Sequence, residues 1–427
     1  DYVSIYYEQY IFIRRVAEVM GYVIFKNATL IDGNGGDPRY NVSVLVENNI
    51  IREVSECGIS LQSADVIDCK GNTLMPGLVD GHMHLGLIEI EVVDIVRRNP
   101  IGLIAARMFR NMRELLEQGY TSARDTGGAD AGFRLAMENG EAVGPRLRVS
   151  GPCIAQSGGH GDNRGPSEYR PYYEGNMGFR SRLADGVPEV LKACRETLRE
   201  GADFIKIMAC GGCASPTGGP NACQYTFDEM KAAVDVADNA GTYVAAHCYS
   251  DKSISRCTEA GILTIEHGNL LERPTAKLMA QKGTYLVPTQ ITYEMVLEHA
   301  KDSLSKFMYD KFIAVNDRGY EAIKIAMEEG VKIGGGSDLT GRNTKYASGA
   351  IAYQAKAQGA MNAIVSFTRV NAEIMGMSEQ IGTIEEGKLA DIILVNDDPL
   401  KNIDLFKNPK DNILVIMQDG KLYKKMI

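Results

Sequence analysis

The sequence predicts an α/β protein: a (β/α)8 TIM barrel with a small β-sandwich domain that is built from both chain termini. The middle of the chain alternates short apolar runs with segments of helical period, the pattern of repeated βα units around a parallel sheet. Both ends instead carry short alternating strands separated by turn formers. Residues able to bind metals lie on or after five of the middle runs, where such barrels place their active sites.

Length and composition fit this architecture. The chain has 427 residues, which accommodates a barrel of about 250 residues and an accessory domain. Its net charge of −9 argues against nucleic acid or an anionic membrane surface as the main partner. No apolar run is long enough to cross a bilayer. The nine cysteines are scattered without zinc-finger spacing, so we expect reduced thiols and a cytoplasmic location.

The chain is expected to divide into four parts. Residues 1–20 are expected to form an N-terminal tail outside the fold, because Met20 and Gly21 directly precede a regular strand. This tail lacks the basic start and unbroken apolar core of a signal peptide. Residues 21–75 supply the first part of the β domain and residues 377–427 the second. Residues 76–376 form the barrel between them.

Periodicity places the individual elements. The β domain is expected to contain strands at Tyr22–Phe25, Ser43–Glu47, Ile50–Val54, Ala64–Asp68, Asp391–Val395 and Ile413–Met417. The barrel is expected to contain eight strands, at Leu74–Leu85, Thr121–Asp125, Arg146–Gly151, Phe204–Met208, Tyr243–His247, Thr264–His267, Tyr285–Pro288 and Lys332–Gly335. Helices are expected between them, for example at Gly102–Gln118, Pro188–Glu200, Thr226–Ala240 and Lys306–Glu329.

Four of the six histidines stand at the ends of barrel strands. His82 and His84 are one residue apart after an apolar run, so a strand would aim both imidazoles at one point. His247 and His267 close two further short apolar strands. Neutral imidazole is the commonest side-chain ligand of zinc and similar ions. Histidines satisfied within the core are the alternative interpretation, and the repeated placement at strand ends disfavours it.

Lys206 lies in an apolar strand inside the predicted barrel. A buried ammonium ion is costly, and it would repel nearby cations. A neutral lysine amine can add carbon dioxide to become a carbamate, whose two oxygens could each bind one metal. A lysine paired with a buried carboxylate is the alternative.

Asp338 follows three glycines and a serine at the end of the last predicted strand. The glycines allow close backbone approach and let the carboxylate project at the strand end. Such a carboxylate can bind a cation and accept a proton from an attacking water. A helix N-cap is the alternative, since aspartate is a preferred capping residue.

The motifs around these residues resemble the amidohydrolase superfamily. The similarity is to the imidazolonepropionase-like branch, which includes metal-dependent prolidases (Xaa-Pro dipeptidases). The similar stretches are Val79–His84, Phe204–Lys206, Ala245–His247, Ile265–Gly268, Gly336–Asp338 and Gly382–Asp391. The resemblance covers nearly everything from Tyr22 to Gly420.

The resemblance implies a binuclear metal site. His82, His84 and Asp338 would hold one ion, and His247 and His267 the other. Carboxylated Lys206 and a hydroxide would bridge the two. Zinc suits these imidazole and oxygen ligands, and manganese or cobalt could substitute. Two such ions acidify water and polarise a scissile carbonyl, while the aspartate would carry the proton to the leaving amine.

Two further residues bear on the substrate. His160 lies in a glycine-flanked loop, similar to one in the prolidase-like branch whose histidine contacts the substrate carbonyl; an exposed loop histidine is the alternative. Tyr249 follows His247 by two residues, so a continuing strand would aim its hydroxyl at the same cavity, toward a substrate carboxylate. A tyrosine packing at the barrel rim is its alternative. His299 lies in a helical segment and is expected at the surface.

The expected activity is hydrolysis of amide C–N bonds in small substrates: Xaa-Pro or Xaa-hydrophobic dipeptides, or N-acyl amino acids. The alternatives are a cyclic-amide hydrolase, as imidazolonepropionase is, and an esterase or organophosphate hydrolase. A non-catalytic, hydantoinase-like scaffold protein is disfavoured because all six metal-binding residues are present. Related enzymes are commonly homo-oligomers, and the same is expected here.

Overall fold

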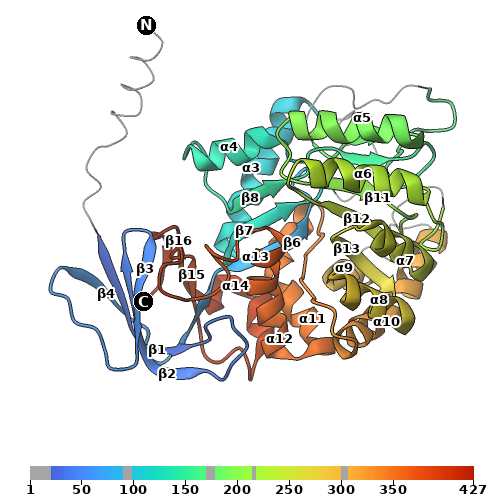
Figure 1. The fold of residues 1–427 in the computed structure, drawn as a ribbon. Helices are drawn as coiled ribbons and strands as arrows, with labels where there is room; N and C mark the ends of the chain where they lie inside the picture. Colours follow the sequence, from blue (N-terminus) through green and yellow to red (C-terminus); the bar gives the residue numbers. More distant parts are fainter. Residues whose placement is uncertain (1–20, 90–98, 170–177, 214–217, 300–305) are drawn as a thin grey trace, which may run out of the picture.

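The computed structural model describes residues 21–89, 99–169, 178–213, 218–299 and 306–427. The predicted N-terminal tail, residues 1–20, lies outside these described residues. The strands gather in three sheets, and most helices surround the two parallel ones (Figure 1). Within the described ranges, no helix combines the length and apolar character needed to cross a bilayer.

One mixed sheet contains strands from both ends of the chain. Its strand order is β17-β16-β15-β5-β1-β2-β3, with β4 paired to β1. Its strands are β1 Tyr22–Leu30, β2 Arg39–Glu47, β3 Ile50–Ser55, β4 Ala64–Asp68, β5 Thr73–Pro76, β15 Ile392–Val395, β16 Ile413–Gln418 and β17 Lys421–Lys425. The two ends of the chain join where β15 pairs antiparallel with β5. The predicted β unit from both termini is therefore present as one sheet, although its lysine-rich edge strand β17 was missed. The prediction of a single barrel strand at Leu74–Leu85 is wrong, because the chain breaks at Gly77 into β5 of this sheet and a separate strand, Leu78–Met83, of a parallel sheet.

Two parallel sheets form the middle of the molecule. The first contains β6 Leu78–Met83, β7 Tyr120–Asp125 and β8 Arg146–Val149, and the second has the order β10-β9-β11-β12-β13-β14. The strands of the second are β9 Cys153–Ala155, β10 Ser181–Leu183, β11 Ile205–Met208, β12 Val244–Ser250, β13 Thr264–Leu270 and β14 Tyr285–Val287. The α/β class and the parallel sheets are as predicted. β9 and β10 were not predicted, because each strand has only three residues, which is too short to show a clear alternation of apolar and polar side chains.

Helices follow most of these strands along the chain. They are α3 Ile101–Glu117, α4 Ala131–Glu138, α5 Gly186–Arg199, α6 Phe227–Asn239, α7 Asp251–Ala260, α8 Arg273–Lys282, α9 Gln290–His299, α10 Lys306–Glu328, α11 Ala350–Gln358, α12 Ala360–Val365, α13 Asn371–Ile374 and α14 Pro409–Asn412. Short turns of other helix types lie at η1 Gly341–Gly349, η2 Ser366–Val370 and η3 Ile403–Lys407. Local signals set several boundaries: α6 begins at a capping box formed by Thr226 and Glu229, and α7 ends at the left-handed Gly261.

The eighth predicted strand, Lys332–Gly335, forms only an isolated bridge to β14. The backbone of segment 332–338 still donates hydrogen bonds to strands on either side. The N–H of Gly334 donates to a carbonyl of β14 at 2.8 Å, and the N–H of Asp338 donates to a carbonyl of β6 at 2.9 Å. The glycines explain the irregular pairing, because a Cβ on Gly336 would lie 2.4 Å from the Cβ of His82. Segment 332–338 therefore lies between the two parallel sheets, and its backbone is in close contact with β6 and β14.

The terminal sheet packs against the side of the molecule formed by α3 and β7 (Figure 1). Its residues Ile393, Ile413 and Ile416 share one apolar cluster with Leu115 and Leu116 of α3. The guanidinium of Arg146 in β8 also pairs with Asp391 at 2.6 Å. The terminal sheet is thus anchored to the parallel sheets.

Candidate metal centre

The predicted ligand residues come together at one place. His82 lies in β6, Lys206 in β11, His247 in β12 and His267 in β13. His84 directly follows β6, and Asp338 ends the irregular segment 332–338. The ring centroid of His267 lies 4.8 Å from that of His82 and 4.6 Å from that of His247. His82, His267 and Asp338 each offer a ligand atom within 4.8 Å of the other two. Parallel strands deliver them together because their carboxyl ends face the same way.

The first half of the site is built from His82, His84 and Asp338. The two Nε2 atoms lie 3.3 Å apart, and Asp338 Oδ1 lies 3.6 Å from the first and 3.4 Å from the second. Both Nδ1 atoms face the other way: that of His82 lies 2.6 Å from a carboxylate oxygen of Glu266, and that of His84 lies 2.8 Å from the carbonyl oxygen of Gly127. These acceptors hold the protons on Nδ1, so both Nε2 lone pairs face Asp338. Such a set of lone pairs fits a divalent cation.

The second half of the site surrounds His247. Among the described residues, no hydrogen-bond partner reaches its buried Nε2 atom. The Nδ1 atom of His267 lies 2.8 Å from the hydroxyl oxygen of Thr289 and 4.0 Å from Asp338 Oδ2. A buried imidazole nitrogen without a partner is costly, so this half also fits a cation ligand set.

Burial keeps these imidazoles in their ligand form. Burial, together with the neighbouring charge of Lys206, lowers the pKa of His84 to about 3. Burial likewise holds the pKa values of His82, His247 and His267 well below the usual range. The neutral form is the one that binds metals.

Lys206 is 1% exposed, and none of the described carboxylates lies within 4.0 Å of its Nζ atom. The alternative of a lysine paired with a buried carboxylate is therefore not supported by the described residues. Burial lowers the pKa of Lys206, while the charge of Glu266 opposes that shift. A neutral amine is the form that can attack carbon dioxide, so the environment suits carbamate formation.

Asp338 has the left-handed backbone angle φ 47°, a conformation that costs a non-glycine residue about 1–3 kcal/mol. Two hydrogen bonds hold its backbone: the N–H of Asp338 donates to the carbonyl oxygen of His82, and the hydroxyl of Thr292 donates to the carbonyl oxygen of Asp338 at 2.7 Å. The helix that follows, η1, has Thr340 at its N-cap, so the capping alternative for Asp338 is wrong. Burial raises the pKa of the Asp338 carboxyl to about 7, against the opposing charge of Lys206.

His160 and Tyr249 flank this cluster. The ring of His160 lies 4.2 Å from that of His247 and under Gly212, where a Cβ would come 2.2 Å from the imidazole. Tyr249 is 4% exposed and stacks on His267 at 5.1 Å. The structure therefore places both beside the histidines, which disfavours an exposed loop position for His160. His299, by contrast, ends α9 with its side chain exposed, as predicted.

The sequence reasoning missed the residues that brace the site. Asp80, Arg124 and Glu266 are fully buried charged residues around His82. Asp125 accepts hydrogen bonds from three backbone N–H groups in the loops that carry His84 and Gly127. Charged residues inside apolar strands were a visible signal for Arg124 and Glu266, since such groups are seldom buried without a role.

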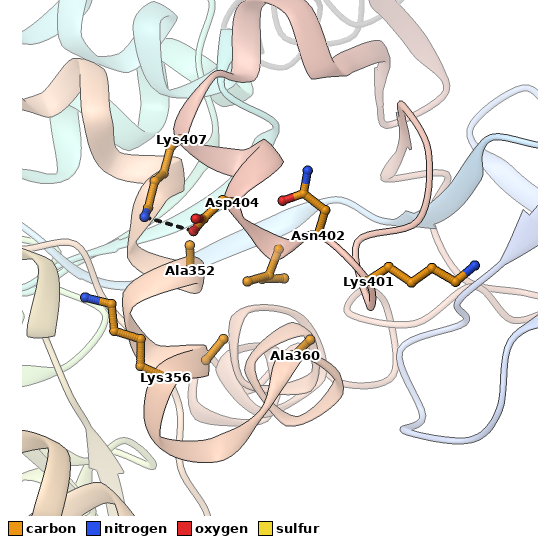
Figure 2. Close-up of a pocket in the computed structure, with 9 residues that line it drawn as sticks. Ala352, Lys356, Ala360, Lys401, Asn402, Asp404 and Lys407 are labelled. Carbon is orange, nitrogen blue, oxygen red and sulfur yellow. Dashed lines mark ion pairs between the residues drawn. The ribbon is translucent and has the colours of Figure 1, made fainter.

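A separate surface cavity of about 350 Å³ lies between α11 and η3 (Figure 2). Lys356, Lys401 and Lys407 reach its rim, and Lys407 pairs with Asp404 at 2.8 Å. Neither the histidines nor Lys206 line it. This cavity is therefore distinct from the candidate metal centre.

Known proteins share this fold and much of the sequence. The profile of the amidohydrolase family matches residues 73–423. Ochratoxinase from Aspergillus niger is 31% identical over 420 residues, covering 92% of this chain and 85% of that protein. A prolidase structure complexed with N-methylphosphonate-L-proline is 36% identical with a TM-score of 0.90, covering 95% of this chain and 100% of that one.

The structure of a Xaa-Pro dipeptidase with bound methionine in its active site is also similar. It is 29% identical with a TM-score of 0.84, and the match covers 95% of this chain and 100% of that chain. The profile match spans both parallel sheets and, in the terminal sheet, β5, β15, β16 and part of β17. The chain belongs to the amidohydrolase family, which is generally metal-dependent, and its similarity to these enzymes supports metal-dependent hydrolysis of an amide bond.

Proposed function

We propose that this amide hydrolase is a binuclear dipeptidase that cleaves Xaa-Pro or Xaa-hydrophobic dipeptides, or N-acyl amino acids. The observation that carries the proposal is the convergence of four buried imidazoles, Lys206 and Asp338 on one point. Similarity over the full length to a prolidase structure bound to a proline phosphonate supports the substrate class. We further propose that segment 332–338 joins the seven strands β6–β8 and β11–β14 in an eight-stranded barrel, beside a terminal β-sandwich.

Two divalent ions are assigned to the six residues. His82, His84 and Asp338 would hold one, His247 and His267 the other, and carboxylated Lys206 would reach both. When bound, such ions acidify water and polarise the scissile carbonyl. Zinc fits the mixed imidazole and oxygen ligands, with manganese or cobalt as substitutes.

The protein's own groups would move protons and orient the substrate. Asp338 faces both halves of the site, so its carboxylate can accept a proton from the attacking water and pass it to the leaving amine. His160 lies above His247 and can donate a hydrogen bond to the substrate carbonyl as negative charge develops.

Tyr249 would recognise the free carboxylate of the substrate. Its hydroxyl lies 3.0 Å from the hydroxyl of Tyr293, which in turn lies 3.1 Å from the acceptor Oδ1 of Asn269, so the tyrosine pair is held in place beside the histidines. The stacking of Tyr249 on His267 fixes the direction of this donor. A phenol held in this way can donate to a carboxylate with little loss of side-chain entropy.

Dipeptides with a free C-terminal carboxylate are expected to be hydrolysed much faster than the same dipeptides with that carboxylate amidated. Tyr249→Phe should raise KM for the free acids by about 10- to 100-fold, the size of one hydrogen bond to a charged group. Steady-state kinetics with matched acid and amide pairs measure both effects. Tyr120→Phe is the control, because Tyr120 is equally buried but donates to the backbone of η1.

Equal turnover of a dipeptide and its amide would contradict recognition of a free carboxylate. A cyclic-amide substrate would then explain the same site better. An unchanged KM in Tyr249→Phe, with acids still preferred over amides, would instead assign carboxylate recognition to another group. A screen of dipeptides, N-acyl amino acids and cyclic amides with zinc and bicarbonate supplied separates these outcomes.

Lys206→Ala is expected to lose most bound metal and most activity, because it removes the group that would reach both ions. A small carboxylate such as propionate, added in solution, should restore part of both. Lys424→Ala on β17 provides a control, since this lysine lies far from the site and contacts backbone carbonyls. Metal analysis and turnover are measured side by side. Electron density that shows a bare amine at Lys206 in a fully metal-loaded crystal would rule out the bridge.

A further inference from the structure

A fully buried ion pair lies beneath the candidate metal centre. Arg124 in β7 and Glu266 in β13 are both 0% exposed, and Arg124 Nη2 donates to Glu266 Oε1 at 2.7 Å. Moving two charges out of water is costly, and replacing such a pair by apolar residues is often neutral or stabilising. Stability alone is therefore a weak reason for this pair.

The pair holds one ligand residue from two sides. Glu266 Oε2 lies 2.6 Å from His82 Nδ1, and Arg124 Nε donates at 2.5 Å to the carbonyl of Gly81, the residue before His82. Thr264 also donates to Glu266 Oε1 at 2.5 Å, so both carboxylate oxygens are engaged. The carboxylate can turn only by breaking charge-assisted hydrogen bonds.

The guanidinium is itself confined. It packs over the ring of Phe204 with its Cζ atom 5.3 Å from the ring centroid. Its third nitrogen, Nη1, lies 3.2 Å from the hydroxyl of Thr264. A planar fork with donors in fixed directions can hold a backbone carbonyl and a carboxylate at once, which a lysine ammonium cannot reproduce.

We propose that Arg124 is a positioning residue for metal binding: through Glu266 and Gly81 it fixes the ring of His82 with Nε2 facing the metal site. Glu266 accepts the Nδ1 proton, so Nε2 keeps its lone pair toward His84 Nε2 and Asp338 Oδ1. This inference rests on the proposed metal-binding role of His82. It assigns the buried pair to preorganisation of the site and not to the stability of the fold.

The test replaces the pair in the full chain by Arg124→Met/Glu266→Leu. Zinc affinity, measured by competition with a chromophoric chelator, should fall by about 10- to 100-fold, the usual effect of losing a partner of a metal-binding histidine. The melting temperature of the metal-free protein can fall, because the Gly81 carbonyl and His82 Nδ1 lose their partners. The diagnostic is therefore the increase in melting temperature caused by zinc, which should shrink. Nitrogen-15 NMR of the metal-free protein should show His82 shifting from its Nδ1–H tautomer to a mixture.

Arg146→Met/Asp391→Leu is the matched control, because it removes another ion pair between strand segments, at 2.6 Å, away from the histidines. That control should keep the wild-type zinc affinity. Arg124→Lys keeps the positive charge but lacks the planar guanidinium, so its zinc affinity should also be lower than that of the wild type. This variant decides the question if the double variant fails to fold.

Wild-type zinc affinity in the Arg124 variants, together with a lower melting temperature without metal, would overturn the inference and make the pair structural. A wild-type protein that binds no divalent metal would instead refute the proposed function itself. The two failures are therefore distinguishable in one set of titrations.

Discussion

Exhaustive chelation is expected to abolish turnover, and zinc, manganese or cobalt to restore it. The physical reason is the set of lone pairs at the site: the Nε2 atoms of His82 and His84 lie 3.3 Å apart, and Asp338 Oδ1 is within 3.6 Å of both. The amide bond is too stable for these side chains to cleave without the charge of the ions. Metal analysis should find about two ions per chain in the active protein.

The control for chelation is the same protein carried through the procedure without chelator. Calcium should not restore activity, because it prefers sets of six to eight oxygen ligands over imidazole. Loss of metal should also lower the melting temperature, since ions that bind only the folded state stabilise it. Full activity in protein shown to be metal-free would reject the whole mechanism and not only the choice of ion.

Asp338→Asn is expected to lower kcat by about two to four orders of magnitude, the usual contribution of a positioned general base. The amide keeps the shape and one ligand oxygen of the carboxylate but cannot accept the proton of the attacking water. Asparagine also tolerates the left-handed backbone at this position, where φ is 47°, so the loop should be preserved. The variant therefore isolates proton transfer from folding.

Single-turnover kinetics and binding of a dipeptide phosphonate analogue measure this effect. The analogue should lose much less affinity than the variant loses turnover, and metal content should stay close to that of the wild type. Asp398→Asn is a suitable control, because this aspartate lies near the surface, where it pairs with Lys401. Near-normal kcat in a metal-loaded Asp338→Asn protein would assign proton transfer to another group.

Helices and strands could be predicted well where the periodic pattern of apolar residues extends over many residues. Helices such as α3, α6 and α10 lie within one or two residues of their predicted ranges. Short or glycine-rich pieces could not be predicted in this way. The three-residue strands β9 and β10 carry too little pattern, and Gly334–Gly336 approach their neighbours too closely to pair as a regular strand.

The candidate ligands could be identified from sequence because their spacing has a direct geometric meaning. Two histidines one residue apart share a strand face, and strand ends in repeated βα units meet at one edge. The same rule linked Tyr249 to His247, and both side chains lie in the cluster. For these residues, sequence position was sufficient to indicate spatial position.

The sequence by itself therefore determined the family, the α/β class and the set of residues that converge. Only the tertiary structure decided how that set is held. Regular alternation would place Glu266 and His267 on opposite faces of their strand, yet both reach His82. The left-handed backbone of His267, with φ 72°, breaks the alternation and turns its ring inward. Arg124 and Glu266 are far apart in sequence, and only the packing of β7 and β13 around one buried point lets the charges meet.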